Sequence, residues 1–297
     1  MSWETSIKGF KSYLQIERSL SDNSIEAYIR DVKKFAKYAI PLKLSELKTK
    51  REHISKFLKE LKNQNISARS QARIISGIKA FYKYLIIENY IKIDPTELIE
   101  SPKIGLKLPD TLSLIEIDQL ISAINLTNKQ GERNRAILET LYSCGLRVSE
   151  LINLQLSNTN LKERYLKVIG KGNKERLAPI GGKAIKYLNI YISEVRNHQN
   201  IKEGHEDFIF LNNRGSKLTR VMIFIIIQKL KEKIGMKKKI SPHTFRHSFA
   251  THLIDGGADL RAVQEMLGHE SITTTEIYTH LDKEYLRSNI VQFHPRS

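Results

Sequence analysis

The residues best suited to chemistry lie in the last third of the chain. His243 and Arg246 stand three residues apart, His269 follows 23 residues after Arg246, and Tyr278 comes nine residues later. Guanidinium groups bind phosphate oxygens through paired donors, imidazole moves protons, and a tyrosine oxygen can attack an electrophilic centre. This combination suits a reaction at a phosphodiester, where negative charge grows as phosphorus becomes five-coordinate.

Two upstream segments supply further candidates. Arg147 follows a Cys-Gly pair that ends a predicted helix, so its guanidinium opens the next turn beside free backbone donors. Lys171 lies in a glycine-containing turn, from which a flexible ammonium could donate a proton to a leaving alkoxide. Lys174 and Arg176 lie beside it. From the residues alone, any of these three could be the acid while the other two contact backbone phosphates.

A metal site is the main alternative for the histidines, since His243, His247 and His252 lie close together in sequence. This segment lacks the glutamate of the zinc-protease pattern His-Glu-x-x-His. His247 and His252 are also five residues apart, which is poor geometry for two ligands on one helix. The chain shows no evident acidic ligand cluster for a metal-dependent nuclease either. We therefore expect no metal and no cofactor.

These motifs resemble those of the site-specific tyrosine recombinases of the Xer group, within the phage integrase family. The resemblance runs nearly end to end and rests on the segments 144–151, 170–176, 243–246 and 268–278, with the basic tail at 294–297. The catalytic set that the resemblance implies is Arg147, Lys171, His243, Arg246, His269 and Tyr278.

The resemblance also implies a mechanism. Tyr278 attacks a DNA phosphate, which gives a 3′-phosphotyrosyl enzyme and a free 5′-hydroxyl, and the hydroxyl of a partner strand later reverses the step. The two arginines hold the non-bridging oxygens and Lys171 protonates the leaving oxygen. His243 acts as acid and base, and His269 binds phosphate. Neither ATP nor a divalent metal takes part.

The implied fold class is mainly α with a small β-hairpin or sheet (α+β). A helical core-binding domain and a catalytic domain form a C-shaped clamp on double-stranded DNA. Four protomers assemble on two sites, as a homotetramer or with a second Xer-type recombinase, and exchange strands through a Holliday junction. The implied role is resolution of chromosome dimers at cell division, regulated by a septal DNA translocase. A mobile-element integrase with the same chemistry and a DNA-binding protein that never cuts are the alternatives.

Composition supports a nucleic-acid partner. The 297 residues carry a net charge of +17, and a surface that basic repels itself unless phosphates neutralise it. Residues 1–110 hold 21 Lys and Arg against 13 Asp and Glu, a net +8, which leaves +9 for 111–297. Both halves are basic, which favours two lobes facing phosphate, although a generally lysine-rich proteome would explain scattered lysines.

The remaining global features predict a soluble cytosolic protein. The single cysteine, Cys144, cannot form an internal disulfide, so we expect a reducing compartment. The sequence shows no amino-terminal signal, and its longest apolar run, 221–227, is far shorter than the roughly 20 residues that span a bilayer. No membrane association is expected.

The elements that must position these residues divide at a linker. We predict a helical, SAM-like core-binding domain over 1–100, a linker at 101–110 and a catalytic domain over 111–297. In the first domain, Asn23 to Glu26 forms a capping box for one helix. A second helix ends at Gln64-Asn65, and a third spans 67–89.

Basic residues of the third helix lie largely off its apolar stripe, so this helix could lie against DNA, although a solvated charged face is equally consistent with the pattern. The DNA-binding candidates are Arg69, Arg73, Lys79 and Lys83 here, with Lys174 and Arg176 in the catalytic domain.

In the catalytic domain, a capping box at 113–116 opens a helix to about residue 124, and another helix spans 134–143. Strands at 165–169 and 176–180 flank the 170–175 turn, and Pro179 suits an edge strand. A strand is possible at 208–211. Helices are predicted at 182–195, 219–234, 243–254 and 260–267. The apolar residues after Tyr278 resemble the family's carboxy-terminal helix that docks on a neighbouring protomer, with packing inside the same chain as the alternative.

Overall fold

The computed structural model describes residues 2–103, 105, 110–170, 174–268 and 280–297, with backbone alone over 280–285. The chain forms two compact units, Met1–Lys107 and Leu108–Ser297. Each unit has its own hydrophobic core. The boundary between them lies within the segment for which a linker is predicted.

The first unit is helical. Its helices are α1 (Trp3–Ile16), α2 (Asp22–Ala39), α3 (Arg51–Asn63) and α4 (Ala68–Ile87). They pack around an aromatic centre in which Trp3 stacks on Phe81 and meets Phe35 edge-on. Helix α1 was not singled out by the sequence patterns, although Ser2 caps it through a hydrogen bond from the Thr5 amide.

Two of the predicted helices in this unit have the expected ends. Gln64 is the C-cap of α3, and Ser67 caps α4 by accepting a hydrogen bond from the Ser70 amide. The predicted capping box at Asn23 to Glu26 is wrong, because α2 begins at Asp22 with Ser21 as its N-cap. Ser21 and Ser24 share a hydrogen bond between their hydroxyls, so a serine does mark the helix start, two residues earlier than predicted.

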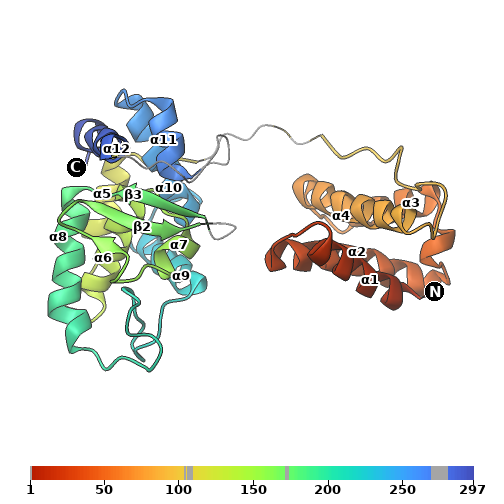
Figure 1. Ribbon diagram of the computed structural model, residues 1–297, viewed down its shortest axis with the longest axis horizontal. Coiled ribbons are helices and arrows are strands. Elements are labelled where there is room, and N and C mark those ends of the chain that lie inside the picture. The colour runs from red at the N-terminus through yellow and green to blue at the C-terminus, as the bar shows by residue number, and fades with distance from the viewer. Residues whose placement is uncertain (1, 104, 106–109, 171–173, 269–279) are drawn as a thin grey trace. The chain divides into compact units, whose positions relative to one another are not determined.

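The second unit combines helices with a small sheet (Figure 1). Its elements are α5 (Leu114–Ser122), α6 (Gly131–Ser143), α7 (Val148–Ile152), β1 (Thr159–Asn160), β2 (Tyr165–Ile169), β3 (Glu175–Pro179), α8 (Gly182–Ile190), α9 (Arg220–Lys233), α10 (Pro242–Asp255), α11 (Leu260–Leu267) and α12 (His280–Phe293). The capping box predicted for α5 is confirmed, since Ser113 and Glu116 cap each other's backbone.

The sheet is antiparallel with the strand order β1-β2-β3. The predicted hairpin is confirmed, with Tyr165 opposite Pro179 and Ile169 opposite Glu175. Pro179 lies on an edge strand, where its missing N–H costs no ladder hydrogen bond. The possible strand at 208–211 is wrong, because Phe208 and Leu211 make only isolated bridges, to Gln155 and Lys217.

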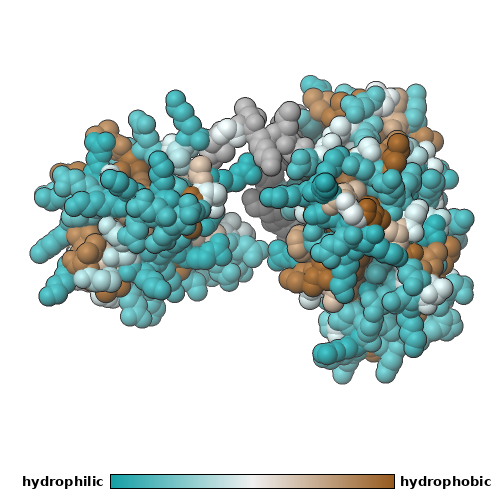
Figure 2. Space-filling view, turned by 180° about the vertical axis from the view of Figure 1, so that it is seen from behind, coloured by the Kyte–Doolittle hydropathy of each residue, from teal (hydrophilic) through white to brown (hydrophobic). Residues whose placement is uncertain are grey.

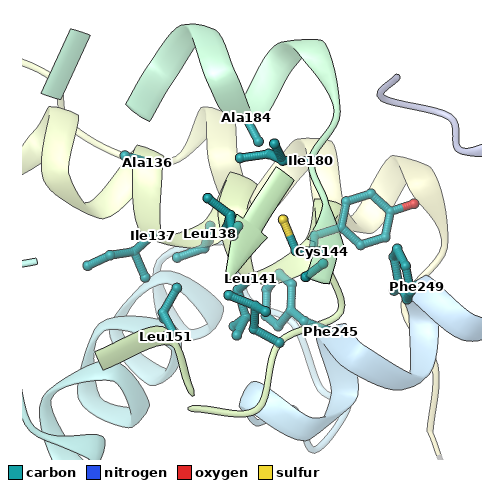
Figure 3. Close-up of a cluster of buried hydrophobic side chains, with 14 of the residues drawn as sticks. Ala136, Ile137, Leu138, Leu141, Cys144, Leu151, Ile180, Ala184, Phe245 and Phe249 are labelled. Carbon is teal, nitrogen blue, oxygen red and sulfur yellow. The ribbon is translucent and has the colours of Figure 1, made fainter. Parts of the chain in front are cut away.

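Helix α6 runs through the core of the second unit. Figure 3 shows Leu138, Leu141 and Cys144 from the α6 segment facing Phe245 and Phe249 of α10. All five side chains are buried. Burial raises the pKa of the Cys144 thiol to about 12, so this cysteine is an unreactive core residue. Packing of α10 on α6 fixes the two segments that carry Arg147 and Arg246.

The carboxy-terminal helix packs inside its own unit. Leu286 and Ile290 of α12 are buried in the core of the second unit, which is the packing inside the same chain that the sequence offers as the alternative, and docking on a neighbour stays a prediction. In the tail beyond it, His294 and Arg296 are buried as well. His294 packs on Tyr142 and Phe249, while the Arg296 guanidinium pairs with Glu139 and Asp118. Val291 of α12 is exposed.

The mainly helical fold with a small antiparallel sheet confirms the predicted fold class. Most of the surface seen in Figure 2 is hydrophilic, with separate apolar patches. Among the described residues, no helix combines the length and apolar character needed to cross a membrane.

Candidate active site

Arg147 is placed by the turn that ends α6. Gly145 adopts the left-handed backbone conformation with φ of +56°. It packs directly on Phe249, so that an added Cβ would lie 2.4 Å from the Phe249 ring. Leu146 is then fully buried, and Arg147 becomes the N-cap residue of α7. The requirement for glycine at position 145 therefore sets where the guanidinium of Arg147 begins.

Glu150 is the centre of the site, and the sequence patterns did not identify it. Its side chain is buried, and its Oε1 accepts from Arg147 Nη1 at 2.7 Å. Its Oε2 accepts from the Arg147 amide at 2.8 Å and from Arg176 Nη2 at 2.7 Å. The Arg246 guanidinium lies 3.8 Å from the same Oε2. A sequence signal existed, since a glutamate three residues after the start of a short helix is typical of a capping box.

Arg246 reaches the site from α10. Its Nη1 donates to the Gly145 carbonyl at 2.8 Å, and its Nη2 donates to the carbonyl of Leu267 at the end of α11. Only 8% of the residue is exposed. Burial, together with the neighbouring charges of Arg147 and Arg176 and against that of Glu150, lowers the pKa of the Arg246 guanidinium to about 10. This guanidinium is therefore held as a cation against its surroundings.

Arg176 lies inside the site rather than on the DNA-facing surface predicted for it. Strand β3 alternates, and Arg176 shares its inward face with Ala178. It pairs across the ladder with the buried Val168. Successive side chains of a strand point to opposite faces, so the sequence of β3 already indicates that positions 176 and 178 share a face. Its exposed neighbour Lys174 remains available to contact a phosphate backbone.

The four charged side chains together are strongly positive. Three guanidinium groups, from Arg147, Arg176 and Arg246, surround the single carboxylate of Glu150, which leaves two net positive charges among them. Such a cluster binds an anion well because the arginines are already desolvated and oriented. Helix α11 packs against both β3 and α10 (Figure 1), the elements that carry Arg176 and Arg246.

Three of the predicted catalytic residues, Lys171, His269 and Tyr278, lie outside the described residues. The described residues that directly precede Lys171 and His269 lie against Arg147. Gly170 directly precedes Lys171, and its Cβ position would be 3.9 Å from Arg147 Nη1. Gly268 directly precedes His269, and its carbonyl accepts from Arg147 Nη2 at 3.2 Å.

His243 is exposed near the amino-terminal end of α10, three residues before Arg246, and the two residues lie along one side of the helix. The other histidines on α10 serve different purposes. His247 is exposed, whereas Nδ1 of His252 is 2.7 Å from the Tyr142 hydroxyl. Within the described part of the chain, no group of three His, Cys, Asp or Glu residues is arranged to hold a metal ion.

The DNA-binding candidates of the first unit all lie on α4. Arg69, Arg73 and Lys83 are exposed and Lys79 is half-buried, so these four basic side chains reach solvent along one helix. Arg73 also pairs with the buried Asp31 of α2, which ties this basic surface to the core of the unit.

Comparisons with known proteins bear on both units. Residues 111–285 match the Phage integrase family, and residues 7–89 match the phage integrase N-terminal SAM-like domain. The chain is 46% identical to the tyrosine recombinase XerD of Staphylococcus haemolyticus over 295 residues, which cover 99% of this chain and 100% of that one.

Solved structures are similar as well. A crystal structure of XerA recombinase is 30% identical, with a TM-score of 0.51 and full coverage of both chains. XerH site-specific recombinase, in a post-cleavage complex with a palindromic difH substrate, is 25% identical with a TM-score of 0.73. That similarity covers 95% of this chain and 83% of XerH.

Proposed function

The chain belongs to the phage integrase family and is a tyrosine recombinase of the Xer type, an enzyme that breaks and rejoins DNA strands, and we propose that Tyr278 is its nucleophile. One observation carries the proposal about the site. Arg147 and Arg246 come from segments 99 residues apart, yet both guanidinium groups adjoin the carboxylate of Glu150. That arrangement leaves an excess of positive charge suited to a phosphodiester.

The proposed step conserves the energy of the phosphodiester. A bond forms between the Tyr278 oxygen and phosphorus while the bond from phosphorus to the 5′-oxygen breaks. The phenol loses a proton, for which His243 is the proposed acceptor, and the leaving 5′-oxygen gains one from Lys171. Because the product is a phosphotyrosyl ester, a 5′-hydroxyl can attack it and restore the DNA without an external energy source.

The other assignments draw support from described neighbours. Gly170 and Gly268 both lie beside Arg147. Because they directly precede Lys171 and His269, their positions support Lys171 as the proton donor and His269 as a phosphate ligand. His243 and Arg246 share one side of α10, which suits two groups that act on the same phosphate. The exposed Lys174 is assigned to the DNA backbone.

The proposed substrate is double-stranded DNA. The net charge of +17 and the exposed basic side chains of α4 support contacts from both units. XerH, a similar protein, is described as bound to its difH substrate. We assign this chain a specific recombination site, on which four protomers act, either all alike or paired with a second Xer-type recombinase.

The proposed biological role is resolution of chromosome dimers in the cytoplasm, coupled to a septal DNA translocase. Support comes from similarity to a XerD recombinase that extends over that protein's whole length. Deleting the encoding gene from the source organism should therefore produce unresolved chromosome dimers at division. Normal segregation in the deletion strain would remove this role while leaving the chemistry intact.

A covalent-capture experiment tests the chemistry. A pool of nicked duplexes prepared from the source genome is incubated with the protein in EDTA. Strand cleavage next to a nick releases a short fragment, which traps the enzyme on DNA. We expect an adduct that survives denaturant, and the captured DNA defines the site. Tyr278→Phe should form none, and an adduct from this variant equal to that of the wild type would refute Tyr278 as nucleophile.

A further inference from the structure

Arg176 is a buried cation for which the proposed chemistry has no direct use. Its guanidinium donates from Nη2 to Glu150, but among the described residues its Nε and Nη1 have no hydrogen-bond partner. Burial lowers the pKa of Arg176, Arg147 lowers it further, and Glu150 opposes that change. A charged group buried at such a cost, with two donors that no described residue satisfies, is expected to have a function.

The neighbouring distances identify that function. Arg176 Nη2 is 2.7 Å from Glu150 Oε2, whereas Arg246 Nη1 is 3.8 Å from the same oxygen. Arg176 therefore makes the close ion pair with this carboxylate oxygen, and the ion pair from Arg246 to the same oxygen is longer. Arg246 is held by the carbonyls of Gly145 and Leu267 instead, and those neutral acceptors leave its charge available to an incoming anion.

Arg176 also supports the turn at the end of α11. A Cβ added at Gly268 would lie 2.7 Å from Arg176 Cδ and 3.0 Å from its Nε, so the side chain lies directly against this glycine. The carbonyl of Gly268 accepts from Arg147 Nη2. The aliphatic part of Arg176 thus contacts the segment that orients Arg147. Its guanidinium binds the carboxylate next to Arg246.

We propose that Arg176 is a positioning residue for phosphoryl transfer, which holds Glu150 away from Arg246 and thereby keeps Arg246 free to bind the scissile phosphate. The proposal rests on the proposed function of the site. Removing Arg176 leaves Oε2 of Glu150 without this partner, and Arg246 is the adjacent cation that replaces it. The resulting ion pair withdraws Arg246 from the phosphate.

The test measures DNA affinity and single-turnover cleavage separately, with the captured nicked duplex at saturating protein. Arg176→Gln should lower the cleavage rate about 10- to 100-fold, a usual range for losing an outer-shell partner. Its dissociation constant should change by less than about two-fold, because the side chain is buried away from solvent. Arg176→Lys keeps a cation beside Glu150 and should recover part of the rate.

Arg133→Gln is the matched control for losing a buried arginine. Arg133 is 4% exposed, lies in the same unit and donates to the Leu211 carbonyl, away from Glu150. We expect this variant to lose stability and keep the wild-type cleavage rate at a temperature where it is folded. Thermal unfolding of every variant identifies that temperature. Equal losses of rate in Arg133→Gln and Arg176→Gln would overturn the positioning role.

A double-mutant cycle with Glu150→Gln decides whether Arg176 acts through the carboxylate. A neutral amide does not attract Arg246 as strongly, so adding Arg176→Gln to Glu150→Gln should change the cleavage rate by less than about three-fold. Additive losses, or a loss of affinity that matches the loss of rate, would overturn the proposal. If the wild type forms no adduct, the proposed function itself fails. If it does and Arg176→Gln cleaves equally fast, only the positioning role fails.

Discussion

The buried histidine of the carboxy-terminal tail should make the second unit sensitive to acid. His294 packs on Tyr142 and Phe249, and its Nδ1 accepts from the Arg296 amide. Burial, together with the charges of His252 and Arg296 and against a hydrogen bond to the Tyr142 backbone, lowers the pKa of His294 to about 3. The native protein therefore keeps this imidazole neutral at every pH where the unfolded chain would begin to protonate it.

The sign and size of the effect follow from proton linkage. Below the ordinary histidine pKa of 6.5, His294 binds a proton in the unfolded chain, whereas in the folded chain it stays neutral down to about pH 3. Stability is therefore full above the unfolded value and falls as the pH drops through this window. Over the interval from about pH 7.5 to about pH 5, this single group removes about 2 kcal/mol from the free energy of unfolding.

His294→Asn isolates this contribution. Asparagine retains an acceptor near the position of Nδ1 but does not titrate. It loses the ring contacts, so its stability should be lower at neutral pH. Between about pH 7.5 and about pH 5 the wild type should then lose about 2 kcal/mol more than the variant, because the other titrating groups are shared.

The two units allow an internal control within one molecule. Trp3 is the only tryptophan and lies in the core of the first unit, so its fluorescence reports the unfolding of that unit. Circular dichroism reports both units. Urea titrations should show the pH-dependent difference between wild type and His294→Asn in the circular dichroism transition alone. Identical pH dependence in the two proteins, or a difference confined to Trp3 fluorescence, would refute the linkage argument.

Three further outcomes are expected. Gly145→Ala should destabilise the protein by roughly 2–3 kcal/mol in urea titrations, through its positive φ and its clash with Phe249. It should also slow covalent capture. Glu150→Ala should cost about 3–5 kcal/mol of unfolding free energy by circular dichroism, since it leaves buried arginines unpaired, and sulfate should restore part of that loss. Replacing Lys79 and Lys83 by alanine should make the slope of log DNA affinity against log salt concentration shallower by about two, since each lysine would lose one phosphate contact. An unchanged slope would exclude both lysines from the interface.

Much of the fold could be predicted because its signals are local. The two glycines that follow α6 and α11 both have positive φ, and Ser113 and Glu116 form the expected capping box. Hydrophobic periodicity located most of the helices, although not α1, and the resemblance to the Xer recombinases is confirmed by the comparisons. Element ends were less predictable. Helix α6 begins at Gly131, three residues before the predicted start, because its first turn packs against the Asn125-Leu126 backbone, which a sequence pattern does not show.

The candidate site was also only partly predictable from the sequence. A motif identifies the residues with recognisable chemistry, but it does not show which charged residues are buried in the site. Glu150 appears from sequence to be an ordinary helix-start glutamate, and Arg176 one basic residue among many in a basic turn. Their roles depend on the ion pairs that Glu150 of α7 makes with Arg176 of β3 and Arg246 of α10, which are far from it in sequence. The period-two alternation of β3 predicts that Arg176 faces inward, whereas the charge of the side chain predicts exposure. The alternation was the correct signal.

The charge balance of this cluster bears on how the enzyme favours the transition state. Lowering the pKa of Arg246 from 12.5 to about 10 means that the protein keeps this cation at a cost of about 3 kcal/mol relative to water. An anion removes that cost, and the more negative the phosphate oxygens become, the more completely it is removed. Charge on those oxygens is greatest when phosphorus is five-coordinate, so the stabilisation is larger in the transition state than in the bound substrate. A site neutralised by a second carboxylate would bind DNA without that difference, and for this reason Arg176 beside Glu150 matters more to rate than to affinity.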